Sequence, residues 1–275
     1  MRRLSIVILF AVVFVGCCIA AKRERLTPYL VDKANNSGIG IIVCPGGSYS
    51  WLDKTNEGET VAKWLNANGI NAFLLKYRVA TVAAYVTGFR VLGIGHKYPD
   101  MLADVEDALR EVYERADEFG IDRAKIGVMG FSAGGHLAMM SYLYNRTEYK
   151  PTFLCCVYPV VTMSGKESHK RSRRGALGVW RQWDKQMRDS LSIEKHVTSD
   201  CPPVFIVDCA DDKVVNPRNS LMLDSALSAN KVKHSYYIYE EGGHGFGVSE
   251  TKGSVESRQW KGTFIKWLHN ILGWI

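Results

Sequence analysis

The chain has 275 residues, of which 47% are hydrophobic and 23% are charged, a composition that is ordinary for a globular protein and excludes an intrinsically disordered one. Its length suits a single large domain. The formal net charge of +7 is a mild excess without a helix-turn-helix, zinc-finger or aromatic-basic signature beside it, so we expect no nucleic-acid partner.

The first residues have the pattern of an export signal. Met1-Arg2-Arg3 is basic, and the run from Leu4 to Ala21 is uncharged and mostly apolar. We therefore predict that residues 1–21 are a signal peptide and that the protein is secreted or periplasmic. The alternative is a membrane anchor that stays attached, for which the run is barely long enough because a span needs about 20 apolar residues.

Two modes of cleavage are open for this segment. Phe14-Val15-Gly16-Cys17 resembles a bacterial lipoprotein signal, in which cleavage precedes Cys17 and Cys17 carries the lipid, although Phe14 departs from the usual Leu. Ordinary cleavage after Ala20 or Ala21 is the alternative. Once the signal is cleaved, membrane attachment would therefore be through a lipid anchor at Cys17.

Within residues 22–275, short apolar runs alternate from residue 39 onward with longer amphipathic runs. This is the pattern of strands joined by crossover helices, so we predict an α/β domain with a mostly parallel central sheet of about six to seven strands and helices on both faces. The predicted strands are Ile39–Cys44, Asn71–Tyr77, Lys125–Gly130, Thr152–Tyr158, Pro203–Cys209 and Lys233–Tyr239. The predicted helices are Glu57–Asn68, Pro99–Phe119, Pro217–Ala229 and Val255–Leu272.

Two stretches interrupt the alternation. Residues 79–97 contain three glycines and are predicted to form a long loop, and residues 160–199 form an insertion with the basic motif HKRSRRG and the pair Trp180 and Trp183. Long insertions in compact domains are often functional, so both are candidates for lining a substrate cleft. The basic run Lys166–Arg174 could equally be a solvated face.

Cysteine usage indicates neither a disulfide framework nor a metal site. Of the five cysteines after the signal, four lie inside apolar runs and are predicted to be buried free thiols: Cys44, Cys155, Cys156 and Cys209. No metal-ligand spacing is present, so we expect no metal.

The strongest chemical motif is Gly130-Phe131-Ser132-Ala133-Gly134, which matches G-x-S-x-G between the strand run KIGVMG and the helical run GGHLAMMSYL. A serine on such a strand-to-helix turn is exposed for attack, and the following helix N-terminus directs donors at developing negative charge. Ser132 is therefore the predicted nucleophile.

A serine nucleophile needs a base and an acid that orients the base. His244 is the predicted base, because it lies in the glycine-rich stretch EGGHGFG between the last strand and the last helix. The acid should follow the preceding strand, where Asp208, Asp211 and Asp212 occur. We favour Asp212, since Asp208 falls within the strand; Asp211 remains the alternative. The remaining histidines fit worse and are expected to be structural or exposed: His96, His136, His169 and His234.

The first long strand ends in Pro45-Gly46-Gly47-Ser48-Tyr49, a partial match to the HGGG oxyanion loop. The backbone N–H groups of Gly47 and Ser48, with that of Ala133 after the nucleophile, are the predicted oxyanion hole.

These motifs occur in the order CPGGSY, KYRV, GVMGFSAGGHLA, HKRSRR, ADDKVVNP and EGGHGFG. In this order the chain resembles the α/β-hydrolase esterases related to hormone-sensitive lipase and, more narrowly, the bacterial acetyl xylan esterases. The resemblance implies the α/β-hydrolase fold with reduced first strands, beginning at a short strand around Tyr29–Val31. It also implies a carboxylic-ester hydrolase that deacetylates acetylated sugars or xylan without a cofactor, and it supports Ser132, Asp212 and His244 as the triad.

Other functions remain open. A general carboxylesterase or lipase-like enzyme is the nearest alternative, and a serine exopeptidase is another, although 275 residues leave no room for the extra domain such enzymes usually carry. A small acyl group requires a short pocket, for which Trp51, Tyr49 and Phe246 are the candidate walls.

Overall fold

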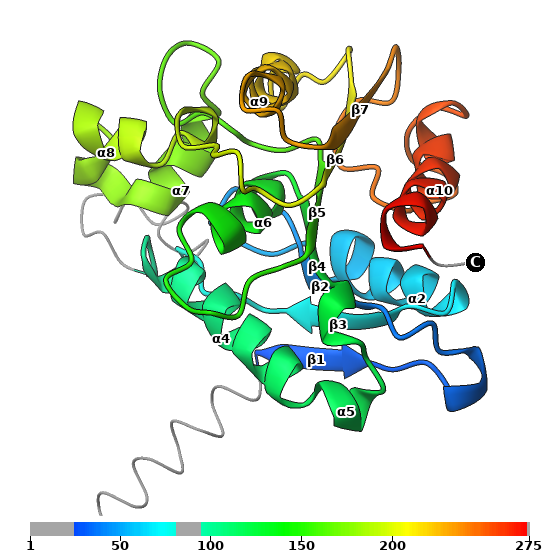
Figure 1. Cartoon of the computed structure of the whole chain (residues 1–275). Helices are drawn as coiled ribbons and strands as arrows, with labels where there is room; N and C mark the ends of the chain where they lie inside the picture. Colours follow the sequence, from blue (N-terminus) through cyan, green and yellow to red (C-terminus); the bar gives the residue numbers. More distant parts are fainter. Residues whose placement is uncertain (1–24, 81–94, 274–275) are drawn as a thin grey trace, which may run out of the picture.

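The structure is a computed structural model that describes residues 25–80 and 95–273 (Figure 1). The predicted signal peptide with Cys17, and most of the loop predicted over residues 79–97, lie outside the described residues. Within the described part, no helix is both long and apolar enough to cross a membrane.

A seven-stranded sheet organises the described residues, in the order β1-β3-β2-β4-β5-β6-β7. Strand β1 runs antiparallel to β3, and the other neighbours are parallel. The sheet confirms the predicted α/β-hydrolase class, and its central strands β2 to β6 are buried throughout, as parallel strands covered on both faces should be. The strands are β1 Leu26–Tyr29, β2 Gly40–Cys44, β3 Asn71–Leu75, β4 Ile126–Phe131, β5 Phe153–Val157, β6 Val204–Cys209 and β7 His234–Tyr239.

The predicted N-terminal strand is displaced. We expected it around Tyr29–Val31, but β1 begins at Leu26 and ends at Tyr29. Leu26 is the position of β1 that is buried, and it pairs with Leu75 of β3. The packing of one apolar side chain therefore decides where this short edge strand begins.

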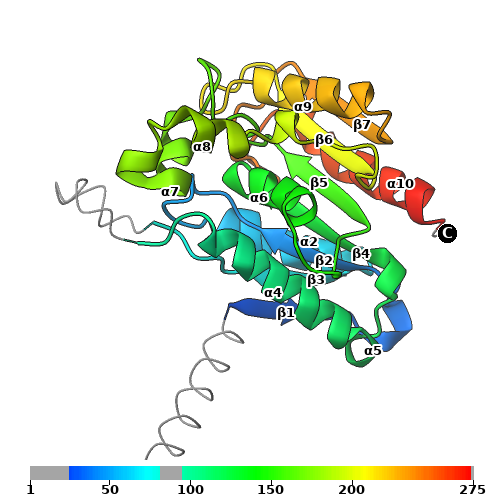
Figure 2. The same ribbon diagram turned by 60° about the vertical axis from the view of Figure 1, so that its left-hand side comes forward.

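Helices cover both faces of the sheet (Figures 1 and 2). Helices α2 and α10 pack with one face, and α4, α6 and α9 pack with the other, which gives two separate hydrophobic cores. The helices are α2 Thr60–Ala67, α4 Asp100–Glu114, α5 Ala116–Phe119, α6 Ala133–Leu143, α7 Lys170–Arg181, α8 Lys185–Ser190, α9 Arg218–Ala229 and α10 Trp260–Leu272. Short 3-10 or π turns are η1 Lys33–Asn35, η2 Thr55–Glu59, η4 Arg123–Lys125, η5 Ile193–Lys195 and η6 Ser257–Gln259.

The largest differences from the predicted helix bounds occur in two helices. The helix expected over Pro99–Phe119 is divided at Arg115 into α4 and α5, and Gly120 caps α5 with a left-handed φ of 64°. The helix expected from Val255 becomes α-helical only at Trp260, because Val255 is exposed and contributes nothing to the buried stripe.

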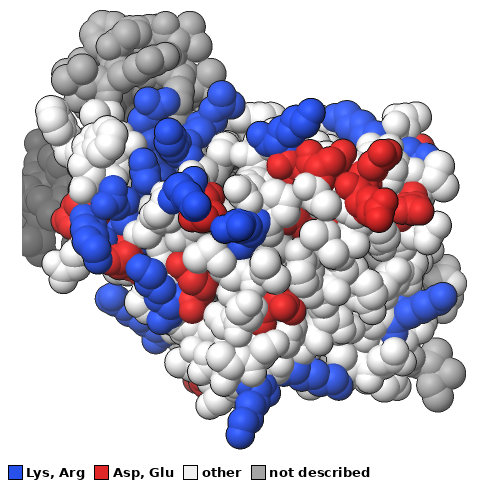
Figure 3. Space-filling model, turned by 90° about the horizontal axis from the view of Figure 1, so that it is seen from above, with Lys and Arg blue, Asp and Glu red and all other residues white. Residues whose placement is uncertain are grey.

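The insertion over residues 160–199 folds into α7, α8 and η5. It packs closely on the loop after β2, since a Cβ placed on Gly175 of α7 would overlap the carbonyl oxygen of Ser48. Its basic run is divided between environments: Arg173 is buried, whereas Lys170 and Arg171 are exposed. Seen from above, Lys and Arg side chains gather on the side of α7 and α8, and Asp and Glu side chains gather on the other (Figure 3).

Candidate active site

The register of the sheet brings the predicted functional segments to one edge. Gly130 near the end of β4 pairs with Cys44 in β2 and with Cys156 in β5. The segments that follow these strands, which contain the PGGS loop, Ser132 and Tyr158, therefore begin side by side.

Ser132 occupies a tight turn between β4 and α6 with φ 53° and ψ −117°. Such a conformation is unfavourable for a residue with a Cβ and is found where the surrounding structure enforces it. The flanking glycines are sterically required, because a Cβ on Gly130 would overlap the carbonyl oxygen of Gly134, and a Cβ on Gly134 would overlap that of Cys44. The turn therefore presents the Ser132 side chain at the end of the sheet.

Ser132, His244 and Asp212 are joined by hydrogen bonds. The distance from His244 Nε2 to Ser132 Oγ is 2.9 Å, and that from His244 Nδ1 to Asp212 Oδ2 is 2.6 Å. A carboxylate can only accept, so Nδ1 carries the proton and Nε2 is left to accept from the serine hydroxyl. Asp212 Oδ1 accepts the N–H groups of Val214 (2.7 Å) and Val215 (3.0 Å), which fixes the carboxylate in place.

The two other aspartates near this strand end have different partners. Asp211 Oδ1 accepts the backbone N–H of Gly243 at 2.8 Å, so Asp211 holds the loop that carries His244 and does not contact the imidazole. Asp208 is buried, and its carboxylate accepts from the Ser220 hydroxyl at 2.7 Å. Burial raises the pKa of Asp208 to about 7. The contacts therefore place Asp212 where an orienting acid is needed.

The loop after β2 carries Gly47 and Ser48, which were predicted to supply backbone donors. Gly47 and Ser48 have positive φ angles of 134° and 57°, and both line a cavity of about 470 Å³ together with Ser132 and His244. The N–H of Gly46 is engaged by Glu57 Oε2 at 2.8 Å, so it is not a donor to a bound group. Ala133, the third predicted donor, is the first residue of α6.

The walls of this cavity differ from the prediction. Trp51 lines it and is 46% exposed, as expected of a residue at a substrate pocket. Tyr49 and Phe246 do not line it: both are buried, Tyr49 against His136 and Phe246 against Tyr158. Both residues lie in or next to the site motifs, but the sequence does not show that their side chains point into the core.

Two residues that were not predicted, Glu57 and Tyr158, connect the loop after β2 to the loop that carries His244. The Tyr158 hydroxyl donates to Glu57 Oε1 (2.7 Å) and accepts from the N–H of Gly247 (3.0 Å). The Tyr158 ring lies 4.5 Å from the His244 imidazole, centroid to centroid. Burial raises the pKa of Glu57, while its hydrogen bonds to Tyr158 and Gly46 oppose that change.

Tyr158 could have been found from the sequence, because it ends a predicted strand at the edge where the other site residues gather. Glu57 carries no such signal within TNEGET, since an acidic residue near a helix start is ordinary. Together the two residues connect the loop after β2 to the loop of His244.

His136 and the cysteines of the described residues are buried away from the triad. His136 is buried, with Nε2 donating to the Leu191 carbonyl (2.8 Å) and Nδ1 accepting from the Tyr49 hydroxyl (2.8 Å); burial lowers its pKa to about 4. The cysteines predicted to be buried free thiols are so, and Cys201 is too. Over residues 25–80 and 95–273, no group of three or more His, Cys, Asp or Glu side chains is placed to hold a metal ion.

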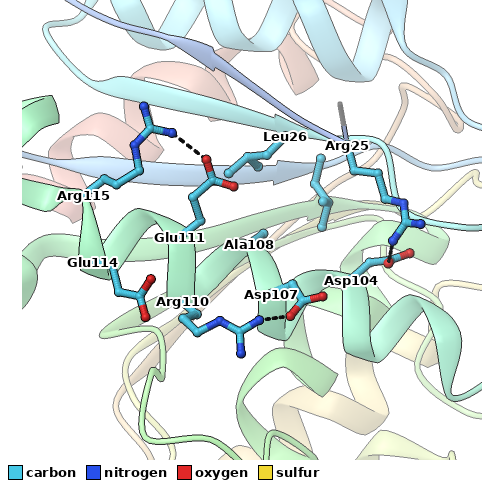
Figure 4. A pocket seen from close by; sticks show the side chains of 10 residues that line it. Arg25, Leu26, Asp104, Asp107, Ala108, Arg110, Glu111, Glu114 and Arg115 are labelled. Atoms are coloured by element: carbon cyan, nitrogen blue, oxygen red, sulfur yellow. Dashed lines mark hydrogen bonds and ion pairs between the residues drawn. The ribbon is translucent and has the colours of Figure 1, made fainter. Parts of the chain in front are cut away.

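A separate cavity of about 230 Å³ lies between β1 and α4, and neither the triad nor the loop after β2 lines it (Figure 4). Its charged side chains pair with one another, as in the contacts Arg25–Asp104 (2.7 Å) and Arg115–Glu111 (2.6 Å). These ion pairs attach the edge of the sheet to α4, and the cavity contains no candidate nucleophile.

Comparison with known proteins agrees with this geometry. The chain is 35% identical over 215 residues to an acetylxylan esterase from Xylanibacter ruminicola, a match that covers 78% of this chain and 42% of that protein. It is 32% identical over 220 residues to endo-1,4-beta-xylanase B from Butyrivibrio fibrisolvens, covering 76% of this chain and 32% of that protein. The chain thus spans less than half the length of these two relatives.

Solved structures show the same fold. An acetyl ester-xyloside bifunctional hydrolase from Caldicellulosiruptor lactoaceticus superposes with a TM-score of 0.78 at 31% identity, covering 91% of this chain and 88% of that one. A carboxylesterase from Lactobacillus plantarum gives a TM-score of 0.72 at 21% identity, covering 89% and 92% of the two chains. The family model of BD-FAE matches residues 28–227, which is most of the chain, and the protein belongs to the BD-FAE family.

Proposed function

We propose that this protein is a serine carboxylic-ester hydrolase that removes acetyl groups from acetylated sugars or xylan through an acyl-enzyme. The observation that carries the proposal is the hydrogen-bonded chain from Ser132 Oγ through His244 to the buried Asp212. Ser132 is the nucleophile, His244 the general base and Asp212 the acid that orients the imidazole.

The proposed reaction follows from these contacts. Ser132 Oγ attacks the ester carbonyl while His244 Nε2 takes its proton, and the negative oxygen that forms is stabilised by the N–H groups of Gly47, Ser48 and Ala133. His244 returns the proton to the sugar oxygen as the ester bond breaks, which leaves acetyl-Ser132. A water molecule activated by His244 then releases acetate and restores Ser132.

The substrate class is supported by the relatives. One carries the name acetylxylan esterase, one is a xylanase, and a solved structure at 31% identity is titled an acetyl ester-xyloside hydrolase. A general carboxylesterase remains the second candidate, because the carboxylesterase structure from Lactobacillus plantarum has the same fold.

A substrate panel separates the two candidates. We expect acetate release from acetylated xylan, and faster cleavage of 4-nitrophenyl acetate than of 4-nitrophenyl octanoate. Faster cleavage of the octanoate, without acetate release from xylan, would establish the general or lipase-like alternative. Ser132→Ala should abolish turnover, and Ser225→Ala on the exposed side of α9 is the matched control that should not.

We also propose that the protein is exported, as a secreted or periplasmic enzyme or as a lipoprotein anchored at Cys17. The basic start and apolar run of residues 1–21 support this. Mass spectrometry of the N-terminus of the mature protein distinguishes the forms: a diacylated Cys17 indicates the lipoprotein, a start near Lys22 indicates ordinary cleavage, and an intact Met1 in the cytoplasm contradicts export.

A further inference from the structure

A second hollow adjoins the catalytic cavity. It has a volume of about 860 Å³ and is formed by the insertion and by the loop after β6. Arg171 and Val214 line both hollows, and Asp212 lines this one, so the two are neighbours across the triad. We call the second hollow the trough; its lining includes Lys166, Ser168, His169, Lys170, Arg171 and Lys213.

The trough has a net positive charge. Lys166, Lys170, Arg171 and Lys213 contribute four positive charges. Two carboxylates also line it: Glu167 lies 3.7 Å from Arg218, and Asp212 is hydrogen-bonded to the neutral His244, so the lining keeps a formal excess of two positive charges. Positive charge held around a concave surface raises the local concentration of an anionic group.

Uncharged polar groups accompany the cations. His169 is mostly buried, and this burial, with the positive charge of Arg171 acting in the same direction, lowers its pKa to about 4, so it is neutral at pH 7. The Ser168 hydroxyl is buried in the trough lining and has no hydrogen-bond partner in the described part of the chain. Buried polar groups are usually satisfied, so this unpartnered hydroxyl is unusual, but its oxygen is closed off from solvent and the positive charges of the trough carry the argument.

We propose that the trough binds a carboxylate-bearing sugar, a uronic acid, in the same oligosaccharide whose acetyl ester lies at Ser132. The inference rests on the proposed function and extends it from acetylated saccharides to acidic acetylated saccharides. The uronate would lie among Lys166, Lys170 and Lys213, while Arg171, which lines both hollows, lies between the uronate and the ester.

A binding measurement tests the trough independently of catalysis. The protein carries Ser132→Ala, and calorimetry compares a neutral xylo-oligosaccharide with the same oligosaccharide bearing one uronic acid. We expect the acidic sugar to bind about three- to tenfold more tightly at low salt, as partly exposed charge pairs allow, and the difference to shrink at high salt. The variant Lys166→Gln/Lys170→Gln/Lys213→Gln should lose the difference.

The matched control removes three exposed lysines outside the trough lining: Lys33→Gln/Lys63→Gln/Lys233→Gln. Retention of the preference in this control supports the trough. Equal binding of the two sugars to the parent protein, persistence of the preference in the trough variant, or its loss in the control would each overturn the proposal.

Acetate release by the enzyme with Ser132 intact, measured on acetylated forms of both sugars, tests the proposed function separately. Failure to release acetate contradicts the saccharide deacetylase, whereas the binding measurement still decides whether the trough prefers the acidic sugar. If the parent enzyme does release acetate, the trough variant should lose the preference in kcat/KM for the acidic substrate and keep its rate on 4-nitrophenyl acetate.

Discussion

Removal of the Tyr158 hydroxyl tests whether the contact between the two site loops supports catalysis. In Tyr158→Phe the ring that lies against His244 stays, and only the hydrogen bonds to Glu57 Oε1 (2.7 Å) and from Gly247 N–H (3.0 Å) are lost. Any loss of activity would therefore come from loop position, because the ring contact with the imidazole is preserved.

The size of the effect follows from those two bonds. Each buried group left without a partner costs about 1–3 kcal/mol, so the free energy of unfolding should fall by about 2–6 kcal/mol. A displacement of His244 by a fraction of an ångström to one ångström would lower kcat by about ten- to a hundredfold. KM should change little, since Tyr158 is buried and does not line the cavity.

The assay combines urea unfolding with steady-state hydrolysis of 4-nitrophenyl acetate at a temperature where circular dichroism shows the variant folded. Tyr113→Phe is the control, because its hydroxyl donates a comparable bond of 2.6 Å to the Lys150 carbonyl, in contacts separate from the site loops. The control should lose stability and keep its kcat.

A folded Tyr158→Phe enzyme with kcat within twofold of the parent would refute the reasoning. The Tyr158 contact would then be structural only, and Glu57 would have no role in positioning the loop of His244. A fall in kcat of equal size in Tyr113→Phe would attribute the loss to general destabilisation.

Further predictions concern the acid, the oxyanion loop and a buried carboxyl. Asp212→Asn should lower kcat by about three to four orders of magnitude, because the amide favours the wrong imidazole tautomer. Asp211→Asn should keep kcat within about tenfold of the parent value. Equal losses of initial rate in the two variants would contradict the assignment of the acid. Gly47→Ala should lower kcat by about a hundredfold or more, because its Cβ would overlap a backbone carbonyl, whereas Gly262→Ala meets no neighbour and should leave kcat unchanged. The pKa of Asp208 is about 7 in the folded protein against 3.8 as its ordinary value. The folded state therefore binds the proton of Asp208 more tightly than the unfolded state does. The resulting contribution to the free energy of unfolding is complete below about pH 4 and is lost as the pH rises through 7. Asp208→Asn should thus be more stable than the parent at pH 8, by up to about 4 kcal/mol, and similar to it at pH 4; urea unfolding at both pH values measures this, and an equal difference at both would disprove it.

Much of the fold could be predicted because its signals are local. The six predicted strands all occur, with ends that differ by a few residues, since consecutive apolar residues bounded by turns mark strands buried on both faces. The Ser132 turn could also be predicted, because Gly130 and Gly134 are needed wherever strand and helix approach so closely. The order of serine, acid and histidine along the chain follows from the same local motifs.

Which of the neighbouring aspartates contacts His244 depended on tertiary structure. Asp211 and Asp212 are adjacent in sequence, and only the path of the loop directs Asp212 to the imidazole and Asp211 to Gly243. The Glu57–Tyr158 hydrogen bond joins residues 101 positions apart, and no local pattern encodes such a pairing.

The walls of the site and the trough were likewise decided by packing. Tyr49 and Phe246 follow motif residues directly, yet their side chains turn into the core, where burying an aromatic ring is more favourable than exposing it at the cavity. The basic run of the insertion was compatible with a solvated face or a site, and the packing of α7 on the loop after β2 buries Arg173, leaves Lys170 and Arg171 exposed, and makes Arg171 line the same cavity as Ser132. The strands and the reactive turn could be predicted from the sequence, because periodicity and backbone sterics act over a few residues. Which side chains meet across those turns could not, because it depends on contacts between segments that only the folded sheet brings together.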